Sequence, residues 1–177
     1  MKVMKFGGTS VGAPARMKEV TKLATSSNEP VFLVLSAMSG TTNSLVEISD
    51  YLYKKNADGA NEVINSLEQK YMKHVEELYS TEEYKEITRN FLISEFNYLR
   101  SFTKELFTSF EEKSIIAQGE MMSTNMVANY MKEQGINAVL LNALDFIRTD
   151  KNSEPDPSYI KEKLTKILGE NKGAQVY

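Results

Sequence analysis

The stretch Lys5-Phe6-Gly7-Gly8-Thr9-Ser10-Val11-Gly12 is the part of the sequence on which the interpretation of the whole chain depends. It follows the apolar pair Val3-Met4 and precedes an amphipathic segment, which predicts a strand that enters a helix through a glycine-rich loop. Glycine has no Cβ, so such a loop brings backbone N–H groups close to an anion, and Lys5 would add a positive charge beside it. The spacing matches neither the Walker nor the dinucleotide-binding pattern. Taken alone, the loop is as consistent with a tight turn as with a phosphate site.

The composition excludes several classes of protein. The 177 residues carry a net charge of −3, with 41% apolar and 25% charged residues, which is ordinary for a globular domain. This charge argues against a nucleic-acid partner. No apolar run is long enough to cross a bilayer and the N-terminus shows no signal-peptide pattern, so no membrane is expected. The absence of cysteine excludes disulfides and thiolate chemistry, and the expected location is cytoplasmic.

The N-terminal third is predicted to form an α/β unit with parallel strands. Apolar residues at helical spacing predict a helix at residues 15–26, and the continuous apolar run at residues 31–35 predicts a buried strand. Together with the first strand they form a βαβ unit. The second strand ends in another small-residue loop, Ser36-Ala37-Met38-Ser39-Gly40-Thr41-Thr42-Asn43. Ligands bind beyond the carboxyl ends of parallel strands, so two such loops favour a site for a small anionic molecule.

A long antiparallel pair of helices is expected as an insertion at residues 61–113. Its apolar and aromatic residues repeat at helical spacing as far as Phe110, and they are expected to form the core between the helices. His74, the only histidine, falls among charged residues and is expected to be a solvated surface residue. Gly119 and Glu120 lie in a helix predicted at residues 114–134. A glycine there costs about 1 kcal/mol relative to alanine, so it requires a packing or ligand reason.

The C-terminal part is predicted to add strands at residues 138–141 and 174–177, with a helix at residues 158–168 between them. Glu154 and Asp156 could be interpreted as a carboxylate pair for acid–base chemistry. They lie beside Pro155 and Pro157 in a polar segment, which favours a solvated loop.

Three blocks, in this order, closely resemble the N-terminal part of aspartokinases, which are members of the amino-acid kinase family. They are Lys5-Phe6-Gly7-Gly8-Thr9-Ser10-Val11, Val34-Leu35-Ser36-Ala37-Met38-Ser39-Gly40-Thr41-Thr42-Asn43 and Gly119-Glu120-Met121-Met122-Ser123-Thr124. The segment Arg148-Thr149-Asp150 falls where the family has a similar Arg-Thr segment. The resemblance implies a three-layer αβα sandwich around a mainly parallel sheet. It also implies ATP-dependent phosphorylation of the side-chain carboxylate of L-aspartate to 4-phospho-L-aspartate, with Mg²⁺ present, as the first step toward lysine, threonine and methionine.

The resemblance assigns roles to individual residues. Lys5 is the candidate catalytic residue, because phosphoryl transfer depends on positioning and on neutralisation of charge. The candidates for binding the ATP phosphates are Lys5, Phe6, Gly7, Gly8, Ser36 and Gly40. Thr42, near the start of its helix, would bind an aspartate carboxylate, and Glu120 would accept the α-ammonium group. Arg148 is a further candidate for an aspartate carboxylate, although a structural ion pair is at least as good an explanation. No protein ligand for a metal is assigned.

The same resemblance implies that the chain is the N-terminal part of a longer enzyme. The nucleotide-binding subdomain and the regulatory ACT domains of the family would lie beyond Tyr177, so residues 1–177 alone are expected to be inactive, and analogy implies a homodimer for the full-length enzyme. Two alternatives remain open. One is an amino-acid kinase that acts on glutamate or carbamate. The other is a non-catalytic binding module that uses the helical pair, which solvent exposure of Phe91, Phe96 and Phe102 would favour.

Overall fold

The fold begins with two parallel strands joined by a helix. A computed structural model of the chain describes residues 1–26, 29–104 and 106–177. Strand β1 (Lys2–Phe6) pairs in parallel with β2 (Val31–Leu35), with Lys2 opposite Val31 and Phe6 opposite Leu35. Helix α1 (Pro14–Ala24) lies between them in the sequence and buries Met17 completely. The predicted βαβ unit is therefore confirmed.

Two further segments extend the sheet on the other side of β2. Val176 forms parallel bridges with Val31 on one side and with Ala138 on the other. The N–H of Leu33 donates to the carbonyl of Tyr177 at 2.8 Å. The order across the sheet is therefore β1, β2, residues 175–177 and residues 138–139. The strand predicted at residues 174–177 is reduced to Val176, which bridges both of its neighbours, and the strand predicted at residues 138–141 is reduced to a single bridge at Ala138. Residues 138–139 have no partner on their outer side within the described chain.

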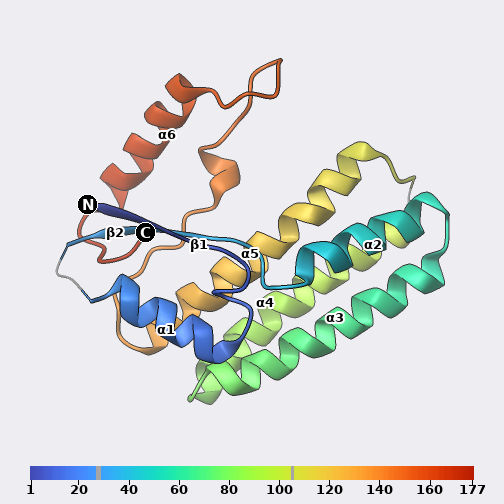
Figure 1. Ribbon diagram of the computed structural model, residues 1–177, viewed down its shortest axis with the longest axis horizontal. Coiled ribbons are helices and arrows are strands. Elements are labelled where there is room, and N and C mark those ends of the chain that lie inside the picture. The colour runs from blue at the N-terminus through green and yellow to red at the C-terminus, as the bar shows by residue number, and fades with distance from the viewer. Residues whose placement is uncertain (27–28, 105) are drawn as a thin grey trace.

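The strands lie between helices on both sides. Figure 1 shows α6 (Pro157–Glu170) on one side of the strands and α1 on the other, together with the long helices that follow β2. This arrangement is the predicted αβα sandwich with a mainly parallel sheet. None of the described helices has the length and apolar character needed to cross a membrane.

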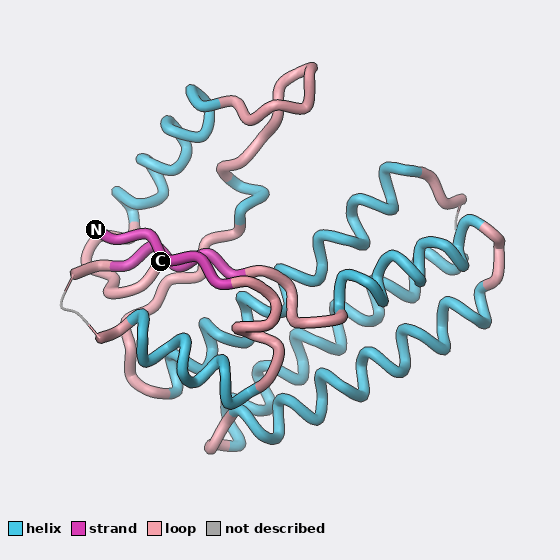
Figure 2. Tube along the Cα trace, viewed as in Figure 1, coloured by secondary structure: helices cyan, strands magenta, loops and turns pink. Residues whose placement is uncertain are grey.

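Four helices form a bundle beside the sheet (Figure 2). They are α2 (Thr41–Tyr53), α3 (Ala57–Leu78), α4 (Glu82–Ser101) and α5 (Ser109–Glu133), and each packs against the next while α2 also packs against α5. The predicted insertion corresponds to α3 and α4. Tyr71 and Phe96 are fully buried between these two helices, with ring centroids 5.7 Å apart in an edge-to-face arrangement. The aromatic stripe is therefore mainly helix–helix core.

The second helix of the predicted pair ends earlier than expected. A 3₁₀ turn, η1 (Phe102–Lys104), follows α4, and Thr108 then begins α5 through a reciprocal capping box with Glu111. Leu106 and Phe110 were expected in the core but are 82% and 75% exposed. The apolar periodicity continues across this break and conceals it. The Thr-x-x-Glu pattern at residues 108–111 is the local signal that locates it.

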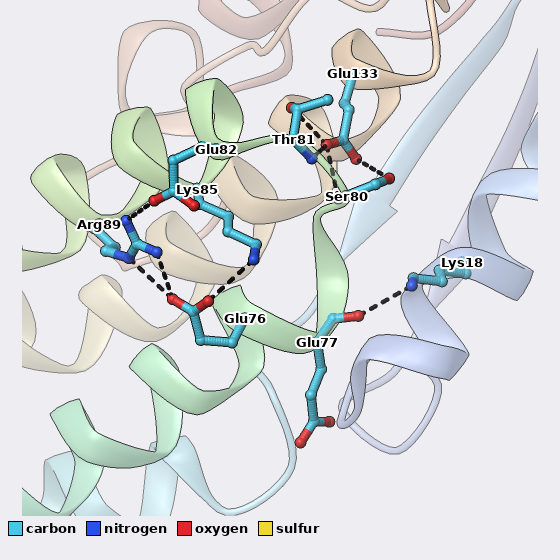
Figure 3. A network of polar contacts seen from close by, with 9 residues as sticks. All are labelled: Lys18, Glu76, Glu77, Ser80, Thr81, Glu82, Lys85, Arg89 and Glu133. Atoms are coloured by element: carbon cyan, nitrogen blue, oxygen red, sulfur yellow. Dashed lines mark hydrogen bonds and ion pairs between the residues drawn. The ribbon is translucent and has the colours of Figure 1, made fainter.

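The N-terminus of α4 is capped by a residue from α5. Thr81 is the N-cap of α4, and its side chain makes no capping hydrogen bond. Glu133 instead accepts hydrogen bonds from the N–H groups of Ser80 at 2.8 Å and Thr81 at 2.7 Å (Figure 3). Burial acts to raise the pKa of Glu133, but the hydrogen bonds from Thr81 and Ser80 outweigh it and lower the pKa below its ordinary value. Nearby, Glu76 of α3 pairs with Arg89 of α4 on the surface of the bundle.

Replacing Glu133 with alanine should lower the free energy of unfolding by about 1 kcal/mol at pH 7, as expected for the loss of a helix cap. Because the folded-state pKa of Glu133 is lowered, this contribution is present above the ordinary carboxyl pKa and is lost as the pH falls through the folded value. Urea unfolding at pH 7 and pH 3.5 measures both effects. Glu86→Ala, at an exposed position of α4, is the control, and an equal loss in both variants would contradict the capping role.

Candidate functional site

The first loop of the site, residues 7–12 after β1, contains glycines with different environments. A Cβ at Gly8 would lie 2.8 Å from the carbonyl oxygen of Ala37, and a Cβ at Gly12 would lie 2.9 Å from the carbonyl oxygen of Gly8. These two positions therefore require glycine for packing. At Gly7 the nearest heavy atom to an added Cβ is the Nζ of Lys5, at 3.9 Å. Gly7 thus lies beside the lysine amine and not against packed backbone.

The second loop, residues 36–40 after β2, lies against the first. The N–H of Ser36 donates to the carbonyl of Phe6 at 3.1 Å, and the N–H of Ser39 donates to the carbonyl of Gly8 at 3.2 Å. Gly40 ends the loop as the N-cap of α2, with a φ of 82° that favours glycine. The two loops therefore meet at one edge of the sheet, as the sequence predicted.

The N-terminus of α2 is available to a ligand. Gly40 provides no capping side chain, and the N–H groups of Thr42 and Asn43 have no hydrogen-bond acceptor among the described residues. The side chain of Thr42 is exposed, whereas that of Thr41 is fully buried. Unpaired N–H groups at a helix N-terminus carry partial positive charge. This end of α2 therefore suits an anionic group such as a carboxylate.

Helix α5 contributes a carboxylate to the second loop. The N–H of Ala37 donates to Oε1 of Glu120 at 3.2 Å, and the hydroxyl of Ser123 donates to the carbonyl of Ser36 at 2.8 Å. A Cβ at Gly119 would lie 2.8 Å from the Cβ of Ala37, which is the packing reason for glycine within this helix. Glu120 is exposed, and its Oε2 accepts no hydrogen bond from the described residues. Oε1 is therefore held by the loop, and Oε2 can accept a hydrogen bond from a cationic group.

Helix α3 holds the second loop from another side. The Nζ of Lys70 donates to the carbonyl of Ser39 at 2.7 Å. The hydroxyl groups of Tyr71 and Thr41 are 3.0 Å apart and buried, and burial raises the pKa of Tyr71. Tyr71 belongs to the aromatic residues that were expected to form the core of the helical pair, and Lys70 was not among the predicted site residues. Both contacts join segments about thirty residues apart, so no local pattern indicates them.

The structure brings most of the predicted site residues together on these adjoining segments: Lys5, Phe6, Gly7, Gly8, Ser36, Gly40, Thr42 and Glu120. Arg148 has other partners. Its guanidinium lies 2.7 Å from the carboxylate of Asp156 and 4.1 Å from the ring centroid of Tyr159. Asp156 also caps α6, which agrees with the structural interpretation of the Glu154 and Asp156 segment. The structure thus gives Arg148 an ion pair, and its role toward aspartate stays a prediction.

His74 differs from the prediction. It is half-buried, and its Nδ1 is buried without a hydrogen-bond partner among the described residues. Burial, followed by the positive charge of Lys70, lowers the pKa of His74. Helix α1 packs against α3, with the Nζ of Lys18 donating to the carbonyl of Glu77 at 3.0 Å. The charged neighbours of His74 in the sequence do not reveal this packing.

A cavity of about 480 Å³ lies between β2, α5 and residues 138–147. Its lining is mainly aliphatic and aromatic; it includes Glu120 of the candidate site but none of Gly7, Gly8, Gly40 and Thr42. An apolar lining does not favour an anionic ligand. The candidate site is therefore the junction of the two loops and not this cavity.

Comparison with known proteins places this geometry in context. Residues 1–176 match the model of the amino acid kinase family. The chain is 30% identical over 164 residues to aspartokinase 1, chloroplastic, of Arabidopsis thaliana, covering 87% of this chain and 28% of that protein. It is 29% identical over 157 residues to the aspartokinase of Candida albicans, covering 82% of this chain and 28% of that protein. The chain thus spans 28% of the length of these two curated relatives.

Solved structures share the fold. The crystal structure of E. coli aspartokinase III in complex with aspartate and ADP gives a TM-score of 0.81 at 22% identity, covering 99% of this chain and 39% of that chain. The complex of the same enzyme with lysine and aspartate gives a TM-score of 0.84 at 22% identity, covering 99% of this chain and 40% of that chain.

Proposed function

The chain belongs to the amino acid kinase family, and on that basis we propose that it forms the phosphate-loop and aspartate-binding part of an aspartate kinase. The observation that carries the proposal is the position of Glu120, whose carboxylate is bonded to Ala37 in the loop that leads to the open N-terminus of α2. A carboxylate and a helix N-terminus on one loop complement the ammonium and carboxylate groups of an amino acid. The aspartokinase relatives and the E. coli complex with aspartate and ADP support the same substrates.

In the proposed reaction, a side-chain carboxylate oxygen of L-aspartate forms a bond to the γ-phosphorus of ATP. The bond from that phosphorus to the β,γ-bridging oxygen breaks, and ADP leaves. Lys5 and the N–H groups of Gly7 and Gly8 would neutralise charge on the transferring group. The N-terminus of α2, with Thr42, would hold an aspartate carboxylate, and Oε2 of Glu120 would accept the α-ammonium group.

Metal and nucleotide binding need groups beyond these. Among the described residues, no group of three or more His, Cys, Asp and Glu side chains is placed to bind a metal ion. We propose that Mg²⁺ arrives with the nucleotide phosphates, where it would neutralise charge. Because the chain spans 28% of the length of the curated relatives, we also propose that a further segment supplies the adenine-binding part and that residues 1–177 alone do not turn over. A homodimer of the complete enzyme and a cytoplasmic location are proposed by analogy.

The binding-module alternative loses its main support. Phe96 is fully buried, Phe102 is 7% exposed and Phe91 is partly buried, so the aromatic stripe of the helical pair is not a free surface.

Titration of ¹⁵N-labelled residues 1–177 with L-aspartate tests the proposal. We expect shift changes at the amides of Thr42, Asn43 and Ala37, and Glu120→Gln should weaken aspartate binding about tenfold or more, because a hydrogen bond between charged groups is lost. Succinate, which lacks the ammonium group, should bind both proteins equally. L-Glutamate in the same titration distinguishes the glutamate-kinase alternative. Glu86→Gln, on the exposed surface of α4, is the matched control. Unchanged aspartate affinity in Glu120→Gln would refute the ammonium role.

A further inference from the structure

Helix α3 contacts the two residues that flank Gly40. On one side, Lys70 donates to the carbonyl of Ser39 at 2.7 Å. On the other, the hydroxyl of Tyr71 lies 3.0 Å from that of Thr41. Gly40 itself has a φ of 82°, and the nearest atom to a Cβ built there is the Nζ of Lys70 at 3.7 Å. Two consecutive residues of α3 therefore fix both sides of a glycine junction that has little packing of its own.

The Tyr71–Thr41 contact is the more restrictive of the two. Both side chains are 0% exposed, and the tyrosine ring packs edge to face against Phe96. The Thr41 hydroxyl has no other hydrogen-bond partner among the described side chains, so removing either hydroxyl leaves a buried polar group unpaired. Thr41 is the first residue of α2 and directly precedes Thr42. The contact therefore fixes the first turn of the helix whose N–H groups form the candidate carboxylate site.

The Lys70 contact extends to the phosphate loop. The carbonyl of Ser39 accepts from Lys70, while the N–H of the same residue donates to the carbonyl of Gly8 at 3.2 Å. A shift of Ser39 would therefore change the packing between the two loops. Through this residue, α3 is connected to both parts of the site.

We propose that Tyr71 and Lys70 are positioning residues, which hold the N-terminus of α2 and the adjoining loop in the geometry that binds the amino-acid substrate. The expected effect of these residues on aspartate affinity rests on the proposed function. Its structural part, the fixing of residues 39–44, can be measured without any ligand. Neither side chain needs to touch the substrate.

Tyr71→Phe tests the proposal, and the chain contains a matched control. Tyr79, just after α3, also has a buried hydroxyl, but it donates to the carbonyl of Met126 at 2.7 Å, within the bundle. In the ligand-free protein, Tyr71→Phe should speed hydrogen exchange about tenfold at the hydrogen-bonded amides of Ser39, Thr41 and Ser44. The reference is the set of amides of α6, and the cause is the loss of one local hydrogen bond. Tyr79→Phe should leave that ratio unchanged. Aspartate affinity should fall about fivefold to tenfold in Tyr71→Phe only.

Further variants at Thr41 and Lys70 keep the test decisive. Thr41→Val should reproduce the effect of Tyr71→Phe, and the double variant should add little, because the two hydroxyls form one contact. Lys70→Met should weaken aspartate binding. Lys70→Arg, which keeps the positive charge, should retain more of the aspartate affinity than Lys70→Met. Unchanged exchange at Ser39, Thr41 and Ser44 in Tyr71→Phe, or an equal rise in Tyr79→Phe, would overturn the proposal. If the wild-type protein does not respond to aspartate, the proposed function fails, while the exchange data still decide the positioning role.

Discussion

Lys5→Ala is expected to lower kcat by about a thousandfold in the complete kinase that we propose, because removal of one preorganised charge at a transferring group costs a factor of about 10² to 10³. The fold should be unaffected. Lys5 is exposed, its backbone keeps the register opposite Val34, and its side chain makes no ion pair among the described residues. Steady-state kinetics with a coupled assay of ADP release, varying ATP and aspartate separately, measures the change.

Two companion variants define what Lys5 contributes. Lys2→Ala removes a lysine from the same strand, where it forms only an exposed 3.7 Å ion pair with Glu29, and should leave kcat unchanged. Lys5→Arg keeps the charge with a different geometry and should retain part of the activity. A kcat for Lys5→Ala within about tenfold of the wild-type value would show that Lys5 is not the main charge at the transferring group.

Gly8→Ala is expected to lower the free energy of unfolding by about 2 kcal/mol or more, as overpacking in a well-packed region does. The added Cβ would lie 2.8 Å from the carbonyl oxygen of Ala37, which is backbone and cannot rotate away. The two loops would have to separate, and the 3.2 Å hydrogen bond from Ser39 to Gly8 would be strained or lost. The variant should therefore also lose its response to aspartate at Thr42 and Asn43.

Gly7→Ala is the control, because it makes the same chemical change one residue earlier. An added Cβ there would meet only the Nζ of Lys5, at 3.9 Å, which is the end of a flexible side chain. Neither glycine has a positive φ, so alanine is compatible with the backbone at both positions. Urea unfolding of the two variants should show a loss in Gly8→Ala only. Equal stability of both variants would mean that the loops do not need the close approach at Gly8.

The parts of the site that could be predicted are those that local sequence determines. A buried strand followed by small residues fixes where each loop begins, and parallel strands bring such loops to one edge, so the first and second loops were found together. Glu120 was assigned its role by the resemblance of the block Gly119-Glu120-Met121-Met122-Ser123-Thr124 to aspartokinases. The contacts of Lys70 and Tyr71 could not be found in this way, because they depend on how α3 packs against residues about thirty positions earlier.

The misplaced features have similar causes. The break between α4 and α5 was predicted too late, after residue 113, because apolar spacing continues through residues 106–110, where Leu106 and Phe110 face solvent. His74 was assigned to the surface from its charged neighbours, whereas its Nδ1 is buried without a hydrogen-bond partner among the described residues. The strand at residues 138–141 shortened to one bridge because strand length depends on partners that the strand itself does not encode.

The position of Val176 between Val31 and Ala138 has a consequence for biosynthesis. During translation, β1, β2 and the α2–α5 bundle leave the ribosome well before residues 175–177. The inner edge of β2 therefore has no hydrogen-bond partner while the rest of this region can already fold. An unpaired strand edge is a template for pairing with other chains. Between completion of α5 and emergence of residue 177, the nascent protein therefore presents a strand edge that is open to pairing with other chains.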